Sequence, residues 1–146
     1  MALQNTNYKQ DRGNQSYQND PDFLADFKTD WIKVGINMEC IEYTDKFGKA
    51  LCRELTTSQI RNVFGELKRI QMKTFDLAKT SFLLLKPKMA YAAARDNKRG
   101  LQQLVKVFNK AHETVDVSGV NGPKHFQNLM DFMESILAYH KAYGGK

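Results

Sequence analysis

The sequence predicts an all-α protein, a compact bundle of about five or six helices with a disordered N-terminal tail. Apolar residues recur at helical spacing from Phe23 almost to the C-terminus, and no segment alternates between apolar and polar residues for long enough to form a strand. The chain has 146 residues, of which 42% are hydrophobic, which is enough for one packed domain. We expect that domain to cover residues 21–146.

The tail is predicted from composition. Residues 3–20 are rich in Asn and Gln and contain almost no aliphatic side chains. Such a segment cannot bury enough apolar surface to offset the entropy lost on ordering. We therefore expect residues 1–20 to be disordered.

The first helix is predicted to begin at Asp20-Pro21, because Asp caps helices and Pro suits their first turn. Its apolar face carries three rings at four-residue intervals: Phe23, Phe27 and Trp31. Weak helix formers over Val34–Asn37 predict a break. A second, less regular helix is expected to end before Leu55.

The strongest helix start lies at Thr56, which has capping-box spacing to Gln59. The helix that follows is predicted to bury one apolar face: Ile60, Val63, Phe64, Leu67 and Ile70. Pro87 is expected to interrupt the next helix, because the residue before a proline is disfavoured in the α region. A new helix is then predicted from Lys88 to Asn97.

Two further amphipathic helices are predicted after Gly100, separated by a loop at residues 118–123. The buried face of the first is Leu101, Leu104, Val105, Phe108, Ala111 and His112. The buried face of the second is Phe126, Leu129, Met130, Met133, Ile136, Leu137 and His140.

Positive charge is concentrated in the middle of the chain. The formal net charge is +6 overall, but residues 1–55 carry −2 and residues 56–146 carry +8. Residues 61–110 hold twelve Lys and Arg against three Asp and Glu. Such asymmetry is typical of a surface that meets a polyanion, although a solvated face kept for solubility explains the charge alone equally well.

No enzyme or metal signature is found. The sequence has no phosphate-binding glycine motif, no nucleophile elbow and no HExxH, and its three histidines have no partner at ligand spacing. We expect no catalytic residue, no metal and no cofactor, with His112 and His140 serving the core. Cys40 and Cys52 form no CxxC pair and are expected to be buried thiols. The absence of a signal peptide and of any long apolar run predicts a cytoplasmic protein that does not bind a membrane.

The basic residues fall into two predicted rows at helical spacing. Arg61 and Lys68 share one flank of a helix with Gly65, and a second row contains Lys88, Arg95 and Arg99 with Ala92 between them. A small residue within a row lets a sugar–phosphate backbone approach closely. The alternative is that Arg61 and Arg95 bridge helices or cap carbonyls. Tyr91 and Tyr143 could stack on bases, but we expect Tyr91 to pack in the core.

Three motifs resemble one family. LTTSQIR at Leu55–Arg61, LLKPKMAYAAAR at Leu84–Arg95 and FMESILAYHKAYG at Phe132–Gly144 are similar to the small subunits of the type III-A CRISPR interference complex, the Csm complex. The likeness runs from about Phe23 to Lys146. The long Asn/Gln-rich tail departs from the family pattern.

The resemblance implies a non-catalytic antiviral subunit. It implies a helical bundle whose copies stack along the ribonucleoprotein beside the guide RNA and contact mainly the target RNA. The partners implied are the large signalling subunit, the backbone subunits and further copies of the chain, with cleavage carried out by other subunits. The motifs carry RNA-binding roles to Ser58, Gln59, Arg61, Lys88 and Arg95. Helical geometry adds two cations to this set: Lys68 and Arg99.

Two other hypotheses remain open at this point. The chain is alternatively a helical protein-interaction scaffold whose basic face docks on an acidic partner protein. A nuclease is the third possibility, disfavoured by the lack of a paired acidic site.

Overall fold

The computed structural model describes residues 22–96 and 98–145, without the side chains of residues 57, 63 and 96. The predictions for the tail, for the Asp20-Pro21 helix start, for the Val63 side chain and for Asn97 lie outside the described residues. The described residues form seven helices and no strand, in the order α2 (Phe23–Asp26), α3 (Asp30–Lys33), α4 (Met38–Cys52), α5 (Thr57–Gln71), α6 (Phe75–Asp96), α7 (Arg99–Thr114) and α8 (Gly122–Ala142). The predicted all-α class is confirmed.

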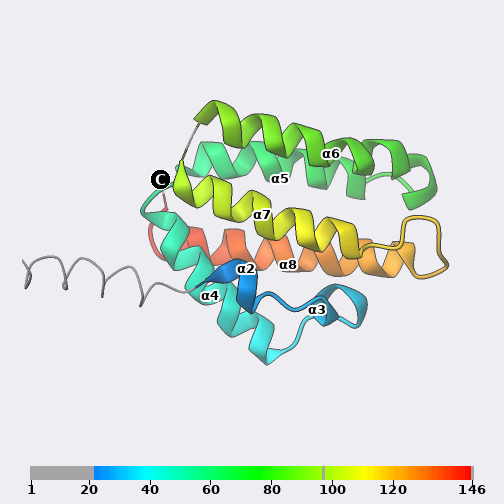
Figure 1. Ribbon diagram of the computed structural model, residues 1–146, viewed down its shortest axis with the longest axis horizontal. Helices are drawn as coiled ribbons and strands as arrows, with labels where there is room; N and C mark the ends of the chain where they lie inside the picture. The colour runs from blue at the N-terminus through cyan, green and yellow to red at the C-terminus, as the bar shows by residue number, and fades with distance from the viewer. Residues whose placement is uncertain (1–21, 97, 146) are drawn as a thin grey trace, which may run out of the picture.

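The helices are arranged around α8. The short helices α2 and α3, together with α4, lie along one side of α8, and α5 and α6 lie along the opposite side (Figure 1). Helix α7 contacts both groups as well as α8. Helix α6 therefore forms one edge of the molecule, and α3 and α4 form the other (Figure 1).

The N-terminal rings are buried as predicted, but they do not belong to one helix. The chain leaves helical geometry at Phe27, where ψ is 136°, and separates α2 from α3. The break allows Phe23 to stack on Phe47 of α4 with ring centroids 4.2 Å apart. It also allows Phe27 and Trp31 to contact Phe132 of α8. Tertiary packing of the rings prevails over the helical periodicity.

Helices α4 and α8 cross at close range, because Gly48 removes the side chain at their contact. A Cβ atom at Gly48 would lie 2.6 Å from Tyr139 Cβ and 2.8 Å from the His140 backbone nitrogen. Helix α4 begins as a capped helix, since Asn37 Oδ1 accepts a hydrogen bond from Cys40 N at 2.8 Å. The predicted break before α4 is confirmed, and Gly35 has a φ of +140°, a conformation that favours glycine.

The predicted capping box is confirmed at the start of α5. Thr56 Oγ1 accepts from Gln59 N at 3.2 Å, and Gln59 Oε1 accepts from Thr56 N at 2.9 Å. The apolar face buries four of its predicted members, Ile60, Phe64, Leu67 and Ile70.

The prediction that Pro87 interrupts a helix is wrong, because α6 runs through it from Phe75 to Asp96. Proline in a helix interior costs about 3 kcal/mol and leaves the carbonyl four residues earlier without its partner. Here that carbonyl belongs to Leu83, a residue exposed to solvent, so water can satisfy it. The continuous helix buries Phe82 and Leu85 before the proline and Met89 after it on one face, and this burial offsets the lost bond.

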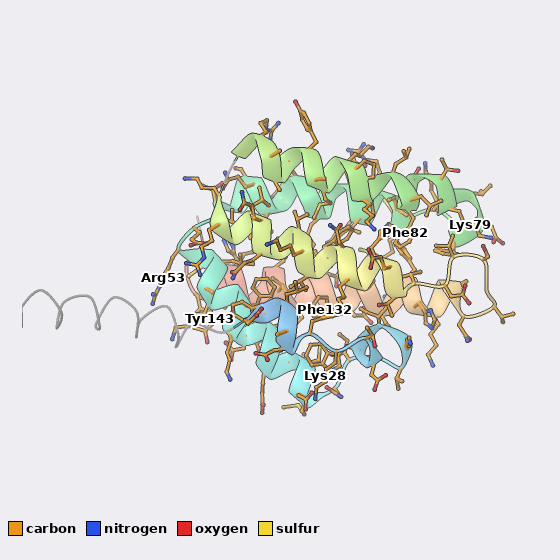
Figure 2. The ribbon with its side chains drawn as sticks, in the orientation of Figure 1. Lys28, Arg53, Lys79, Phe82, Phe132 and Tyr143 are labelled. Carbon is orange, nitrogen blue, oxygen red and sulfur yellow. The ribbon has the colours of Figure 1, made fainter. Side chains whose placement is uncertain are left out.

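Helices α7 and α8 bury the predicted faces, apart from Leu137, which is half-buried. Helix α7 starts at Arg99, directly after the extended residue Lys98. Gly100 lies in its first turn against Leu51 of α4 and against Glu54 in the connection after α4, where a Cβ atom would collide with the Glu54 side chain. Figure 2 shows Phe132 of α8 among the α2–α4 side chains.

Only one of the two thiols is buried as predicted. Cys40 is fully buried, and burial raises the pKa of its thiol to about 12. Cys52 is half-buried near the end of α4, where its thiol donates to the Lys49 carbonyl at 3.0 Å. Cys52 is less buried than predicted because it lies beside the buried Leu51 on α4 and not on the buried face itself.

We predict that Gly48→Ala destabilises the protein by about 1–3 kcal/mol, because the added methyl group forces α4 and α8 apart. Gly65→Ala is the matched control, since nothing lies within 4 Å of a Cβ atom at this helical position. It should stabilise the protein by about 0.5–1 kcal/mol through helix propensity. Urea denaturation followed by circular dichroism measures both, and equal effects of the two changes would contradict the close crossing.

Candidate nucleic-acid interface

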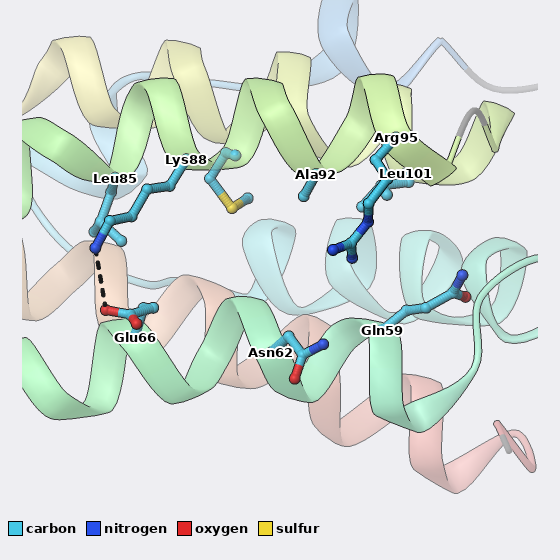
Figure 3. A pocket seen from close by; sticks show the side chains of 9 residues that line it. Gln59, Asn62, Glu66, Leu85, Lys88, Ala92, Arg95 and Leu101 are labelled. Atoms are coloured by element: carbon cyan, nitrogen blue, oxygen red, sulfur yellow. Dashed lines mark ion pairs between the residues drawn. The ribbon is translucent and has the colours of Figure 1, made fainter.

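A hollow between α5 and α6 brings three of the predicted RNA-binding residues together (Figure 3). Its volume is about 200 Å³. Gln59 contributes from α5, and Lys88 and Arg95 contribute from α6. The remaining lining residues are Asn62, Glu66, Leu85, Met89, Ala92 and Leu101. We call this hollow the α5–α6 groove.

Helical spacing explains why these side chains meet. Lys88 and Arg95 are seven residues apart and therefore lie on one flank of α6, with Ala92 between them. Asn62 and Glu66 of α5 are four residues apart and face the same space. In Figure 3, the Arg95 and Lys88 side chains reach from α6 toward α5 on either side of Ala92. The small Ala92 side chain keeps the space between the two cations open.

The ion pair that spans the groove, between Lys88 and Glu66, is weak. Lys88 Nζ lies 3.8 Å from Glu66 Oε2, and Arg69 lies 3.5 Å from the other oxygen of the same carboxylate. Both lysine and glutamate side chains are partly exposed, so the pair contributes little to stability. Gln59 is half-buried and its Oε1 is engaged in the capping box, so it supports the helix start as well as lining the groove.

The other predicted row lies elsewhere on α5. Arg61 and Lys68 are exposed and do not line the groove. Counting from Gln59, they are rotated by about 200° and about 180° around the helix axis, so they lie on the flank that faces away from α6. Neither makes an ion pair with any residue that the structure describes. Ser58 is exposed at the start of the same helix.

The prediction that Lys88, Arg95 and Arg99 lie on one helix is confirmed for Lys88 and Arg95 and is wrong for Arg99. Arg99 is the first residue of α7, because α6 ends at Asp96 and Lys98 is extended. Exposed cations continue along α7 as Lys106 and Lys110. Lys106 lines a hollow with Asp22 and Leu24 of the N-terminal segment, so it does not extend the surface of the α5–α6 groove.

The outer face of α6 carries an apolar stripe that the sequence analysis missed. Leu77, Leu84 and Tyr91 follow one another at intervals of seven residues and are 78%, 48% and 68% exposed. Leu83 is also exposed beside them. The prediction that Tyr91 packs in the core is wrong, since the buried face of α6 is already filled by Phe82, Leu85 and Met89. The signal in the sequence that could have indicated this stripe was the seven-residue spacing of its apolar residues.

His112 and His140 are buried in the core, as predicted, and all three histidines bond to backbone groups outside their own helices. His112 Nε2 lies 2.7 Å from the Phe82 carbonyl, and its ring stacks on Phe82 with centroids 4.1 Å apart. His140 Nε2 lies 2.8 Å from the Leu55 carbonyl and is fully buried. His125 Nδ1 accepts a hydrogen bond from Asp116 N at 3.2 Å. The His112 and His140 bonds tie their helices to segments 30 and 85 residues away along the chain, whereas the His125 bond ties α8 to the loop directly before it.

Among residues 22–96 and 98–145, no group of three or more His, Cys, Asp or Glu side chains is placed to hold a metal ion. Within the same ranges, no helix is both long and apolar enough to cross a membrane.

Fold and surface together define an all-helical protein with a cationic groove along one edge. A family model described as Csm2 Type III-A matches residues 37–146. The chain belongs to this family and is a small subunit of the type III-A CRISPR complex. The predicted likeness extended further toward the N-terminus, to about Phe23, whereas the match begins at residue 37, next to α4. No curated protein and no solved structure matches the chain.

We predict that folding stability falls as the pH is lowered through about 6.5. Burial lowers the pKa of His112 below its ordinary value of 6.5, so the unfolded chain takes up a proton more readily than the folded one. This residue alone lowers stability by at most about 1.4 kcal/mol per pH unit below that point. Thermal melts of the wild type and His112→Gln at pH 7.5 and 5.5 measure the effect. Identical pH dependence in both proteins would exclude His112 as its source.

Proposed function

We propose that this chain binds RNA as a non-catalytic small subunit of the type III-A complex, through the α5–α6 groove and the cations around it. The observation that carries the proposal is the placement of Lys88 and Arg95 on one flank of α6 with Ala92 between them. Family membership supports it, since the complex is RNA-guided. The ligand proposed is the target RNA, alone or paired with the guide RNA, and the complex acts in the cytoplasm.

Backbone contacts suit such a subunit better than base-specific contacts do. In an RNA-guided complex, base pairing reads the sequence, so the protein needs to hold strands of every sequence. Lys and Arg contacts to phosphate give affinity that is independent of sequence and falls with salt. The cations of α5, α6 and α7 meet this requirement.

We predict that Lys88→Gln/Arg95→Gln weakens binding to single-stranded RNA of any sequence. The salt dependence should become shallower by about 0.7 in the log–log slope for each phosphate contact removed. Arg61→Gln/Lys68→Gln tests the second row in the same way, and fluorescence anisotropy across a salt series measures both. Lys33→Gln/Lys46→Gln on α3 and α4 is the control with the same change in charge.

Each outcome of this titration has a distinct meaning. If the control weakens binding as much as the α6 variant, only net charge matters and the groove is not the RNA surface. If the wild-type chain binds no RNA at moderate salt but binds an acidic protein partner, the scaffold hypothesis holds instead. RNA cleavage in the presence of divalent metal would overturn the non-catalytic role.

We also propose that copies of the chain contact one another through the apolar stripe of α6. Monomeric proteins rarely expose a continuous row of large apolar side chains without a partner. On the opposite edge of the molecule lies a hollow of about 400 Å³, with Phe23, Trp31 and Tyr43 in its lining. Asp26, Glu39 and Glu42 also line it, although Lys28 pairs with Glu39 at 2.5 Å.

Charge and position favour this pairing of surfaces. The stripe is bordered by the cations Lys88 and Arg95, whereas the hollow on the opposite edge is lined by three carboxylates and two lysines, Lys28 and Lys46. The two surfaces lie at opposite edges of the molecule (Figure 1). Contact between different surfaces of successive copies is head-to-tail and generates an open row when the rotation between copies does not close a ring. Further contacts to the backbone subunits and the large subunit belong to the same proposed assembly.

We predict that Leu84→Glu lowers self-association of the chain at least tenfold, because it places a charge in the middle of the stripe. Val120→Glu is the matched control, since Val120 is 98% exposed in the loop before α8. Sedimentation velocity over a range of concentrations gives the association constant. A wild-type chain that stays monomeric throughout, or an unaffected Leu84→Glu variant, would contradict contact through α6.

A further inference from the structure

We propose that the α5–α6 groove holds one nucleobase of the bound RNA, turned out of the strand. The inference rests on the proposed RNA-binding function and adds a ligand subsite to it. A groove that bound phosphate alone would need cations at its rim but no hollow behind them. The structure shows both, because a cavity of about 200 Å³ extends between the two helices beneath Lys88 and Arg95.

The walls of the cavity suit the faces of an aromatic ring. The apolar residues of the lining are Ala92, which is half-buried, and Leu85, Met89 and Leu101, which are 1%, 4% and 1% exposed. Leu85, Met89 and Leu101 are buried, so they belong to the rigid core and do not need to be ordered when a ligand binds. Nucleobases bind proteins by placing their flat faces against apolar or aromatic side chains.

Hydrogen-bonding groups stand on the opposite wall, where the edge of a base would lie. Asn62 offers a carbonyl oxygen and an amide donor, and it has no hydrogen-bond partner among the residues described. Gln59 keeps its amide nitrogen available while its oxygen caps α5. Glu66 can accept from an exocyclic amino group. Asn, Gln and Glu side chains recognise base edges in this way.

The mixed donors and acceptors explain how the subsite tolerates different bases. Asn62 presents an amide group that rotates to offer either a donor or an acceptor, whereas Gln59 offers only its amide nitrogen and Glu66 only its oxygens. The rim then holds the neighbouring phosphates, because Lys88 and Arg95 flank the opening. The Lys88–Glu66 pair is 3.8 Å long and partly exposed, so little energy is lost when Lys88 turns toward a phosphate.

Ala92 provides the variant that tests the cavity. Ala92→Leu fills the space between the two cations without changing any charge and keeps a residue of high helix propensity. Ala94→Leu is the control, since Ala94 is exposed on α6 and is rotated by about 200° from Ala92. The probes are two single-stranded oligoribonucleotides of equal length, one normal and one carrying abasic riboses at every position but the ends.

We expect the full-length wild-type chain to bind the normal strand about tenfold more tightly than the abasic strand. This factor lies near the lower end of the range for stacking of one base on an aromatic side chain, as suits a groove whose described lining residues include no aromatic ring. Ala92→Leu should lose that preference while keeping its affinity for the abasic strand and the slope of the salt dependence. Ala94→Leu should behave as the wild type. Asn62→Leu, on the opposite wall, is a second variant that should reduce the preference, and it serves if Ala92→Leu fails to fold.

The results separate this inference from the function on which it rests. Equal wild-type affinity for the two strands, or an unchanged preference in both Ala92→Leu and Asn62→Leu, overturns the base subsite and leaves salt-dependent RNA binding intact. Loss of self-association in Ala92→Leu, with RNA binding unchanged, assigns the cavity to a protein side chain instead. Failure of the wild-type chain to bind either strand overturns both proposals.

Discussion

The close crossing of α4 and α8 at Gly48 is the constraint on which the rest of the molecule depends. Without a side chain at this point, the backbone of α8 comes near enough for His140 to reach the Leu55 carbonyl, 2.8 Å away, at the start of the next segment. That bond fixes the chain just before the capping box of α5. The distance between α4 and α8 therefore determines the position of α5, which is one wall of the α5–α6 groove.

Helix α8 also joins two separate groups of aromatic side chains. Phe132 contacts Trp31 and Tyr43 near the N-terminal helices, and Phe126 contacts Phe75 and Phe82 of α6. Because both rings stand on one helix, the α2–α4 edge and the α6 edge of the molecule are parts of one packed body. The histidine bonds strengthen the same connection, with His112 linking α7 to α6 and His140 linking α8 to the α4–α5 connection.

Local chemistry made much of the fold predictable. The capping box at Thr56, the loop before α8 and the buried faces of α7 and α8 follow from side chains close together in sequence. The errors arose where distant contacts outweigh local preference. Pro87 stays inside α6 because the helix buries side chains both before and after it in the sequence. The N-terminal helix is split because Phe23 and Phe27 pack against different partners.

The site was only partly predictable for the same reason. Helical spacing correctly paired Lys88 with Arg95, but whether Arg61 faces the same space depends on the angle at which α5 packs beside α6. Asn62 and Glu66 carried no signal of their own, since an isolated amide or carboxylate on a helix is ordinary. Tyr91 was misplaced because an aromatic residue among alanines resembles a core residue until the helix on which it stands is found at the edge of the molecule.

One feature of α6 has a geometric consequence. The same rigid helix carries the groove wall on one flank and the apolar stripe on another. A copy held by its neighbour along the stripe has its groove at a fixed separation and rotation from the neighbour's groove. An RNA strand lying across such a row would meet the grooves at equal intervals. The length of each interval would be set by the thickness of the protein, so the assembly would measure length along the strand.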